Sequence, residues 1–146
     1  MGRLSREYQA VWDHYQGLLR PYARLEVHEV PEVPLGSGAA QARTREAAQL
    51  LERLRPHAFL IALDPRGREF SSRELSAFLQ ERKREGTSSF QFVLGGPTGL
   101  DDSVLRAAQV VWSLSKLTFP HQMARCIVLE QLYRAIRIER GEPYHY

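Results

Sequence analysis

Two short stretches of this sequence hold residues that could bind a small ligand. The first is Ser-Leu-Ser-Lys-Leu-Thr-Phe-Pro-His, residues 113–121, in which hydroxyl groups and a lysine precede a rigid proline and a histidine. The second is Gly-Gly-Pro-Thr-Gly-Leu, residues 95–100. Its glycines either let the backbone approach a flat ligand closely or serve a tight turn between a strand and a helix. The spacings G-x-G-x-x-G and G-K-[ST] are absent, so neither stretch predicts a dinucleotide site or a P-loop.

The histidines and the single cysteine do not form a metal-binding pattern. No pair of histidines has the spacing of metal ligands, and Cys126 is not part of a C-x-x-C motif, so we expect no metal site. Cys126 lies in an apolar stretch and is expected to be buried as a small hydrophobic residue. No G-x-S-x-G motif supports a catalytic Ser-His-Asp triad.

Helices and strands are expected to alternate along the chain. The continuous apolar run at 58–63 is typical of a central parallel strand that is covered on both faces. Ser71 and Glu74 have the spacing of a capping box that starts a helix. Further helices are expected at 4–19, 44–55, 121–140 and after Asp101 or Asp102, strands at 25–30, 90–94 and before Pro120, and a loop at 33–42. This alternation predicts an α/β fold with a mainly parallel sheet and flanking helices.

Ligands of open parallel sheets bind beyond the carboxyl ends of the strands. Three expected loops follow strands at that edge, at residues 63–68, 95–100 and 114–121. The two stretches described first therefore belong to the same predicted site.

The composition favours an ordinary globular protein. The chain has 146 residues, of which 43% are hydrophobic and 25% charged, so we expect a single domain over residues 1–146. The net charge of +3 comes without a basic tail, and composition alone does not predict nucleic-acid binding. No apolar run approaches the ~20 residues that span a bilayer and the first residues do not have a signal-peptide layout, so we expect a cytoplasmic protein without a membrane partner.

Four segments, taken together, resemble one known family. They are Leu-Gly-Gly-Pro-Thr-Gly-Leu (94–100), Trp-Ser-Leu-Ser-Lys-Leu-Thr-Phe-Pro-His-Gln-Met-Ala-Arg (112–125), Leu-Glu-Gln-Leu-Tyr-Arg-Ala (129–135) and Pro-Tyr-His (143–145). In this order they are similar to the SPOUT-superfamily methyltransferases that methylate N3 of a pseudouridine in 23S ribosomal RNA. The resemblance runs from residue 59 to the C-terminus. It implies an S-adenosylmethionine-dependent enzyme that acts on the rRNA of assembled ribosomes.

The resemblance also implies features that no local pattern would predict. In that family the C-terminal helix passes through a loop and forms a deep trefoil knot, a rare exception among protein folds. S-adenosylmethionine binds within the knot, and two subunits pair there as a homodimer. By position, the cofactor contacts fall on Leu63, on Gly95 and on a loop that consists of Leu114, Ser115, Lys116, Leu117, Thr118 and Phe119.

Methyl transfer to a ring nitrogen requires a base that removes the proton of that nitrogen. The resemblance makes His145 the first candidate and His121 the second, although His121 equally fits a residue that orders the corner at Pro120. Tyr144 could stack on the flipped-out base or position it.

Arginines near the predicted site are candidates for contacts with RNA phosphates. These candidates are Arg66, Arg68 and Arg125. For Arg134 the favoured interpretation is a pair with Glu130 one helical turn away.

The sequence departs from the family at its start. Family members usually open with a short apolar strand, and this chain begins near the point where that strand should have ended. We expect either that the translation start has been placed too late in this sequence, which we favour, or that the chain folds without this strand. In the second case the alternative function is a non-catalytic knotted module that docks on ribosomal RNA or protein. Cofactor binding separates the two functions.

Overall fold

The computed structural model of the chain describes residues 2–144. Within this range the contacts divide the chain into two compact units. The first unit contains residues 2–3, 28–69 and 87–121, and the second contains residues 4–27, 70–86 and 122–144. The single domain expected over residues 1–146 stays a prediction.

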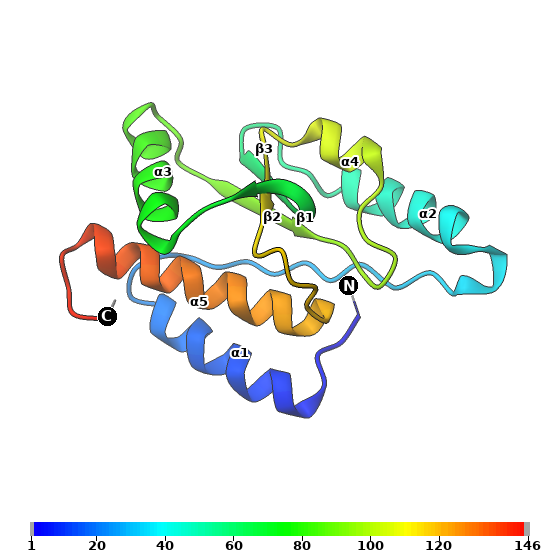
Figure 1. Cartoon of the computed structure of the whole chain (residues 1–146), viewed down its shortest axis with the longest axis horizontal. Coiled ribbons are helices and arrows are strands. Elements are labelled where there is room, and N and C mark those ends of the chain that lie inside the picture. The colour runs from blue at the N-terminus through cyan, green and yellow to red at the C-terminus, as the bar shows by residue number, and fades with distance from the viewer. Residues whose placement is uncertain (1, 145–146) are drawn as a thin grey trace. The chain divides into compact units, whose positions relative to one another are not determined.

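The first unit is built on a three-stranded parallel sheet (Figure 1). Its strands are β1 (Phe59–Glu69), β2 (Phe90–Leu94) and β3 (Val110–Ser113), in the order β2-β1-β3. Both neighbours of β1 run parallel to it, which confirms the predicted parallel sheet. Strand β2 has the predicted bounds, and β1 carries three successive buried residues, Leu60, Ile61 and Ala62, as the apolar run predicted.

Strand β1 continues through residues 64–69, where the sequence predicted a loop. That prediction was wrong because β3 pairs with β1 on both sides of a bulge. Trp112 is the register partner of Leu63 and again of Arg68, so residues 64–67 stand opposite a single residue of β3. Gly67 makes this close approach possible, since a Cβ atom at that position would lie 2.4 Å from the carbonyl oxygen of Val111.

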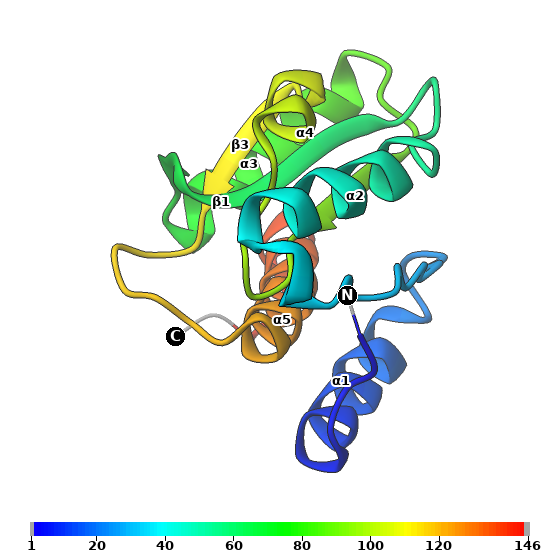
Figure 2. The same ribbon diagram turned by 90° about the vertical axis from the view of Figure 1, so that its right-hand side faces the viewer.

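One face of the sheet is covered by helices α2 (Ala39–Leu51) and α4 (Asp102–Ala107), which lie side by side (Figure 2). A short 3-10 helix, η1 (Leu35–Ser37), precedes α2. The core on this face consists of Ala47, Leu60, Ala62, Val93, Leu100 and Val104. Helix α4 was predicted with Asp101 or Asp102 as its N-cap, and the structure has Asp101 there, whose side chain accepts a hydrogen bond from the backbone amide of Ser103.

Helix α2 is displaced from its predicted position at 44–55. It begins at Ala39 because alanines at positions 39, 40 and 42 are strong helix formers that the loop prediction overlooked. It ends at Leu51, and tighter turns follow in which the amide of Leu54 donates to the carbonyl of Leu51. Arg55 precedes a proline, and a residue in that position is disfavoured in a helix.

The strand predicted at residues 25–30 is absent from the described structure, so that prediction was wrong. Alternating apolar residues favour an extended chain, but a strand also needs a partner for its backbone groups. Pro31 and Pro34 lack the amide hydrogen that a ladder requires. The amide of Val33 instead donates a hydrogen bond of 3.1 Å to the carboxylate of Glu46.

The second unit contains helices α1 (Arg6–Leu19), α3 (Ser72–Arg84) and α5 (His121–Glu139). The first residue of α5, His121, is assigned to the first unit. Helices α1 and α5 pack through a cluster centred on Leu19, Leu129 and Tyr133 (Figure 1). Ser76 of α3 donates a buried hydrogen bond of 2.8 Å to the carbonyl of Ala135 in α5. The predicted capping box of Ser71 and Glu74 is confirmed in both of its hydrogen bonds.

Candidate functional site

The parallel register places the predicted cofactor segments at one edge of the sheet. Leu63 of β1 stands opposite Leu94 of β2 and opposite Trp112 of β3. Gly95 follows Leu94 directly, and the loop after β3 begins at Leu114. Gly95 and the loop after β3 therefore leave their strands at the carboxyl ends, where parallel sheets bind ligands, and Leu63 lies within β1 at the level of those two ends.

The loop after β3 presents apolar side chains and hydroxyl groups that are not committed to the core. Leu117 is 70% exposed, a large fraction for a leucine in a folded chain. Its backbone amide donates a local hydrogen bond of 3.0 Å to the hydroxyl of Ser115. The other predicted contacts in this loop are half-buried at Leu114, Ser115 and Phe119 and exposed at Lys116 and Thr118.

These groups fit the chemistry of S-adenosylmethionine. Small-molecule sites combine apolar walls with a few polar groups that fix orientation. Leu63, Leu114 and Leu117 can supply such walls, and the hydroxyl of Thr118 and the backbone of the loop can supply the polar contacts. The exposed leucine gives the loop an apolar surface that a bound cofactor could cover.

The glycine loop after β2 is tightly packed against itself. A Cβ atom at Gly95 would lie 2.6 Å from the carbonyl carbon of Gly99, and Gly96 and Gly99 form an isolated antiparallel bridge. Gly99 has φ of +76°, in the left-handed region that favours glycine. The tight-turn interpretation of these glycines therefore holds.

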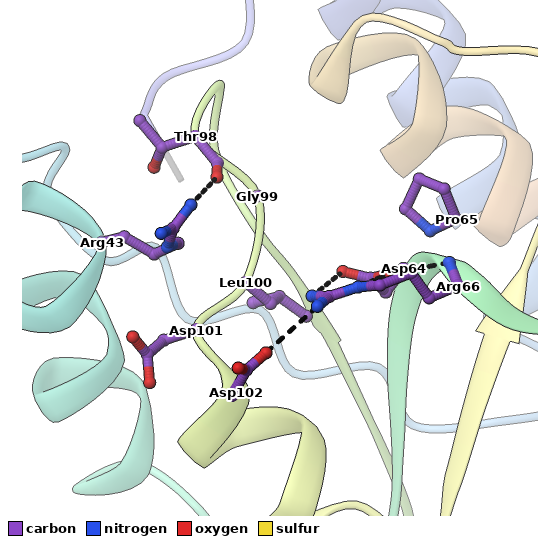
Figure 3. A pocket seen from close by; sticks show the side chains of 9 residues that line it. All are labelled: Arg43, Asp64, Pro65, Arg66, Thr98, Gly99, Leu100, Asp101 and Asp102. Carbon is purple, nitrogen blue, oxygen red and sulfur yellow. Dashed lines mark hydrogen bonds and ion pairs between the residues drawn. The ribbon is translucent and has the colours of Figure 1, made fainter. Parts of the chain in front are cut away.

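A polar cavity of about 330 Å³ lies beside the glycine loop (Figure 3). Its walls come from the bulge of β1, from the end of the glycine loop and the start of α4, and from Arg43 of α2. Arg43 donates a hydrogen bond of 3.4 Å to the carbonyl oxygen of Thr98 and so ties α2 to the glycine loop.

Arg66 is bound to two carboxylates in this cavity (Figure 3). Its Nε donates to Oδ1 of Asp64 at 2.8 Å, and a terminal nitrogen donates to Asp102 at 3.1 Å. The Asp64 side chain is only 6% exposed, whereas those of Arg66 and Asp102 are 61% and 68% exposed. Burial alone would raise the pKa of Asp64, but the hydrogen bonds and charge of Arg66 hold that pKa below its usual value.

The predicted catalytic residues lie in different parts of the chain. His145 is outside the described residues. His121 begins α5 and belongs to the first unit, and its Nε2 lies 3.6 Å from Oε1 of Glu32. Tyr144 belongs to the second unit, where its hydroxyl donates to Glu130 at 3.2 Å and its ring lies edge-on to that of Tyr133 at 4.8 Å.

The ionisation of Tyr144 follows from this packing. Burial, followed by interactions with Tyr15 and the Glu130 carboxylate, raises the pKa of the Tyr144 phenol far above its usual value. In the described position the phenol is therefore protonated at neutral pH and cannot act as a base. A stacking or positioning role for this tyrosine stays a prediction.

The predicted RNA-contacting arginines differ in their surroundings. Arg66 is bound to carboxylates, as described above, and Arg68 is exposed at the end of the bulge. Arg125 is only 8% exposed, and its guanidinium lies 5.3 Å from the centre of the Trp12 ring. The expected pair of Arg134 and Glu130 is present, with Nε donating at 2.9 Å.

Sequence reasoning missed the residues that surround Arg66. The pair Asp64 and Arg66 was visible as an acidic and a basic residue two apart, which places both on the same side of a continuing strand. The contacts with Asp102 and between Arg43 and Thr98 depend on how the loops fold, and no spacing in the sequence indicates them.

Neither a metal cluster nor a membrane helix is found in the part of the chain that the structure describes. Residues 2–144 contain no group of three or more histidine, cysteine or acidic side chains that could hold a metal ion. Within the same residues no helix is both long and apolar enough to cross a bilayer. Cys126 is buried as predicted, and burial raises the pKa of its thiol.

A parallel α/β sheet with a candidate ligand site at its carboxyl edge defines a broad class of proteins. Comparison with known sequences identifies the family within that class. The family described as "Predicted SPOUT methyltransferase" matches residues 1–145, so the chain belongs to the SPOUT methyltransferase family.

Relatives in other organisms cover nearly the whole chain. A "Ribosomal RNA large subunit methyltransferase H" of Pelotomaculum thermopropionicum is 44% identical, over 100% of this chain and 95% of the relative. A protein of the same name from Symbiobacterium thermophilum is also 44% identical, over 99% of this chain and 95% of the relative. One from Desulforamulus reducens is 38% identical, over 99% of this chain and 94% of the relative. The resemblance noted in the sequence is thereby confirmed at the level of the family.

Proposed function

We propose that this chain is an S-adenosylmethionine-dependent methyltransferase that modifies N3 of a pseudouridine in 23S ribosomal RNA. The observation that carries the proposal is the identity of 38–44%, over nearly full length, to relatives named as large-subunit ribosomal RNA methyltransferases. Membership of a methyltransferase family supports the reaction class. We further propose that the substrate is the assembled ribosome and that the reaction takes place in the cytoplasm.

The cofactor site in this proposal is the edge formed by Leu63, Gly95 and residues 114–119. Three adjacent parallel strands converge there, and the last loop carries an exposed leucine beside hydroxyl groups. When bound, S-adenosylmethionine supplies a methyl group on a positively charged sulfur. The task of the protein residues is to hold that group in line with the nitrogen that receives it.

The nitrogen must also lose its proton, and the chain offers two histidines for this step. We assign the base to His145 and keep His121 as the second candidate. The Glu32 carboxylate beside His121 favours an imidazole orientation in which Nε2 faces that carboxylate. A carboxylate beside one ring nitrogen supports a structural role for His121 at the start of α5.

We propose the same assembly for this chain as for the family that it resembles. The C-terminal helix would complete a deep trefoil knot with the loop after β3, and two chains would pair as a homodimer around it. Leu117 is 70% exposed, and such an apolar side chain is one that a cofactor or second subunit would cover.

The proposal is tested by titrating the purified chain calorimetrically with S-adenosylmethionine and by measuring transfer of a labelled methyl group to ribosomes. Leu117→Asp places a charge in the proposed apolar wall, and we expect the cofactor Kd to rise at least about tenfold, equal to 1.4 kcal/mol. Leu35→Asp is a matched control, because Leu35 is 59% exposed in the first unit outside the predicted site. Gly95 is less suitable for substitution, since a side chain there would collide with Gly99 even without a cofactor.

The outcomes separate the enzyme from the alternative module. Saturable binding that Leu117→Asp weakens and Leu35→Asp does not, with methyl transfer to ribosomes, supports the enzyme. A folded wild-type chain that binds ribosomes but neither binds the cofactor nor transfers methyl groups would favour the non-catalytic module. Mass mapping of the labelled rRNA identifies the modified nucleotide, and a methyl group on any base other than pseudouridine contradicts the substrate assignment.

A further inference from the structure

We propose that Arg66 is a positioning residue that holds the glycine loop for cofactor binding by joining Asp64 to Asp102. The inference rests on the proposed function, because it concerns the cofactor site of that enzyme. It also replaces a contact with RNA phosphate as the main role of Arg66. We call the three residues the arginine clasp.

The clasp is anchored on its buried side by Asp64. The Oδ1 atom of Asp64 accepts hydrogen bonds from the backbone amide of Arg66 at 2.9 Å and from its Nε at 2.8 Å. The Oδ2 atom accepts a third bond of 3.1 Å from a terminal nitrogen. A side chain that is 6% exposed thus has both of its oxygens bound by one residue, which fixes the direction of the guanidinium.

The remaining terminal nitrogen of Arg66 reaches across to the start of α4. Asp102 is the first residue of that helix, and its Oδ1 accepts the hydrogen bond at 3.1 Å. Asp102 lies two residues after Leu100, which is 4% exposed and belongs to the core. The clasp therefore ties the bulge of β1 to the far end of the loop that begins at Gly95.

A second contact holds the same loop from the opposite wall of the cavity. Arg43 of α2 donates to the carbonyl oxygen of Thr98. The loop between Gly95 and Asp102 is consequently held by two arginines from two different elements (Figure 3). A loop that is ordered before its ligand arrives loses less conformational entropy on binding, which raises affinity.

The two carboxylates argue against RNA phosphate as the ligand of Arg66. Its Nε and both terminal nitrogens already donate to Asp64 or Asp102. Two N–H groups of the guanidinium remain, but a phosphate bound to them would lie beside the negative charge of both carboxylates. Displacing Asp64 would leave a buried carboxylate without its partner, which is costly.

Asp102→Asn is the variant that tests the clasp. Asp102 is exposed, and removing its charge leaves the buried pair of Asp64 and Arg66 intact. At low ionic strength we expect the Kd for S-adenosylmethionine to rise about two- to fivefold, the range of an exposed ion pair, with kcat unchanged. At about 1 M salt the wild type and the variant should converge, since exposed charges are then screened. Asp102→Glu should restore the wild-type Kd, and Asp13→Asn on helix α1 is the control for loss of one exposed charge.

A second measurement tests, in the absence of the cofactor, whether the arginine clasp orders the glycine loop. Amide hydrogen exchange of residues 96–101 should be faster in Asp102→Asn than in the wild type, with no change in helix α1. If the wild type binds no cofactor, the proposed function fails, and this exchange comparison alone decides whether the clasp orders the loop. Equal exchange and equal Kd at low salt overturn the inference. A fall in ribosome affinity in Arg66→Gln, with the cofactor Kd unchanged, would instead make Arg66 a phosphate ligand.

Discussion

The hydroxyl of Tyr144 donates a hydrogen bond to Oε1 of Glu130, 3.2 Å away, and its ring packs edge-on against Tyr133. The guanidinium of Arg134 lies 4.8 Å from the centre of the same ring. Tyr144 is thus held against α5 by a hydrogen bond, an aromatic contact and a cation–π contact. Contact of Tyr144 with a flipped-out base would require release of these interactions.

Tyr144→Phe should lower the free energy of unfolding at pH 8 by about 0.5–1.5 kcal/mol, because the ring contacts stay and the interactions of the hydroxyl with Glu130 and Tyr15 are lost. The pH dependence has a definite sign. The pKa of Tyr144 is raised in the folded chain, so above about pH 10 the unfolded chain loses this proton first and unfolding is favoured. Wild-type stability should therefore fall more steeply than that of the variant between pH 10 and the folded pKa, as measured by urea unfolding.

Tyr8→Phe, on helix α1, is the control for removing a tyrosine hydroxyl. The pH–rate profile of methyl transfer near neutrality should be the same for wild type and Tyr144→Phe. If Tyr144→Phe removed the limb in which the rate rises with pH, the phenol would act as the base after all.

Arg66→Ala should raise the pKa of Asp64, because burial of the carboxylate and the backbone bond from residue 66 remain while the guanidinium donors and charge are removed. In the wild type the lowered pKa contributes stability above about pH 4, the usual range of an aspartate, and this contribution is lost as the pH falls through the folded pKa. The variant should be less stable at pH 7 by about 1–3 kcal/mol, since a buried acceptor loses its partner. Carboxyl-carbon NMR titration of Asp64 measures the shift directly, and an unchanged midpoint would contradict it.

Gly67→Ala should destabilise the first unit by about 1–3 kcal/mol or more, because the added methyl group would overlap the backbone of Val111. The atoms that it would meet are all backbone, so no flexible side chain can move away. Gly17→Ala provides the opposite case within the same chain. Gly17 lies in helix α1, where an added methyl group would meet nothing within 4 Å, and alanine there should stabilise the chain by about 1 kcal/mol.

Thermal and urea unfolding of the two glycine variants should therefore shift in opposite directions. A neutral Gly67→Ala would mean that β1 and β3 can separate at the bulge without loss of stability. That result would contradict the register in which Trp112 pairs with both Leu63 and Arg68.

Arg68→Gln and Arg125→Gln should separate a phosphate contact from a packing contact. If the exposed Arg68 contacts a phosphate, its loss should weaken ribosome binding and reduce the slope of log affinity against log salt by about one. Arg125 is buried against Trp12, so its loss should lower the free energy of unfolding and leave the salt slope unchanged. An Arg125→Gln chain of wild-type stability with a reduced salt slope would reverse this assignment.

The sequence predicted those elements whose signals are local. Strand β2 is a short apolar run bounded by polar residues and glycine, and α3 starts at a capping box, so neither depends on distant contacts. The predicted strand at 25–30 failed because an alternating pattern does not reveal whether a partner strand exists. The continuation of β1 was missed because Asp-Pro-Arg-Gly is typical of a turn, and only pairing with β3 makes it part of a strand.

The same distinction applies to the candidate site. The meeting of Gly95 and the loop after β3 follows from parallel strands, whose carboxyl ends share one edge, and the register places Leu63 of β1 level with those ends. The arginine clasp could not be predicted, because it depends on the path of the bulge and on the orientation of the short helix α4. Arg66 was predicted as an RNA contact from its charge, but of the two carboxylates that bind it, Asp64 lies in β1 and Asp102 lies at the start of α4.

The bulge of β1 has a consequence for how this segment can vary. Trp112 is paired before and after residues 64–67, so the number of residues between Leu63 and Arg68 is fixed by the sheet itself. Removing one residue would turn the following side chains to the opposite face. The segment is a spacer of set length: a library of substitutions at Pro65 should contain folded members, whereas a library of single-residue insertions or deletions there should contain few.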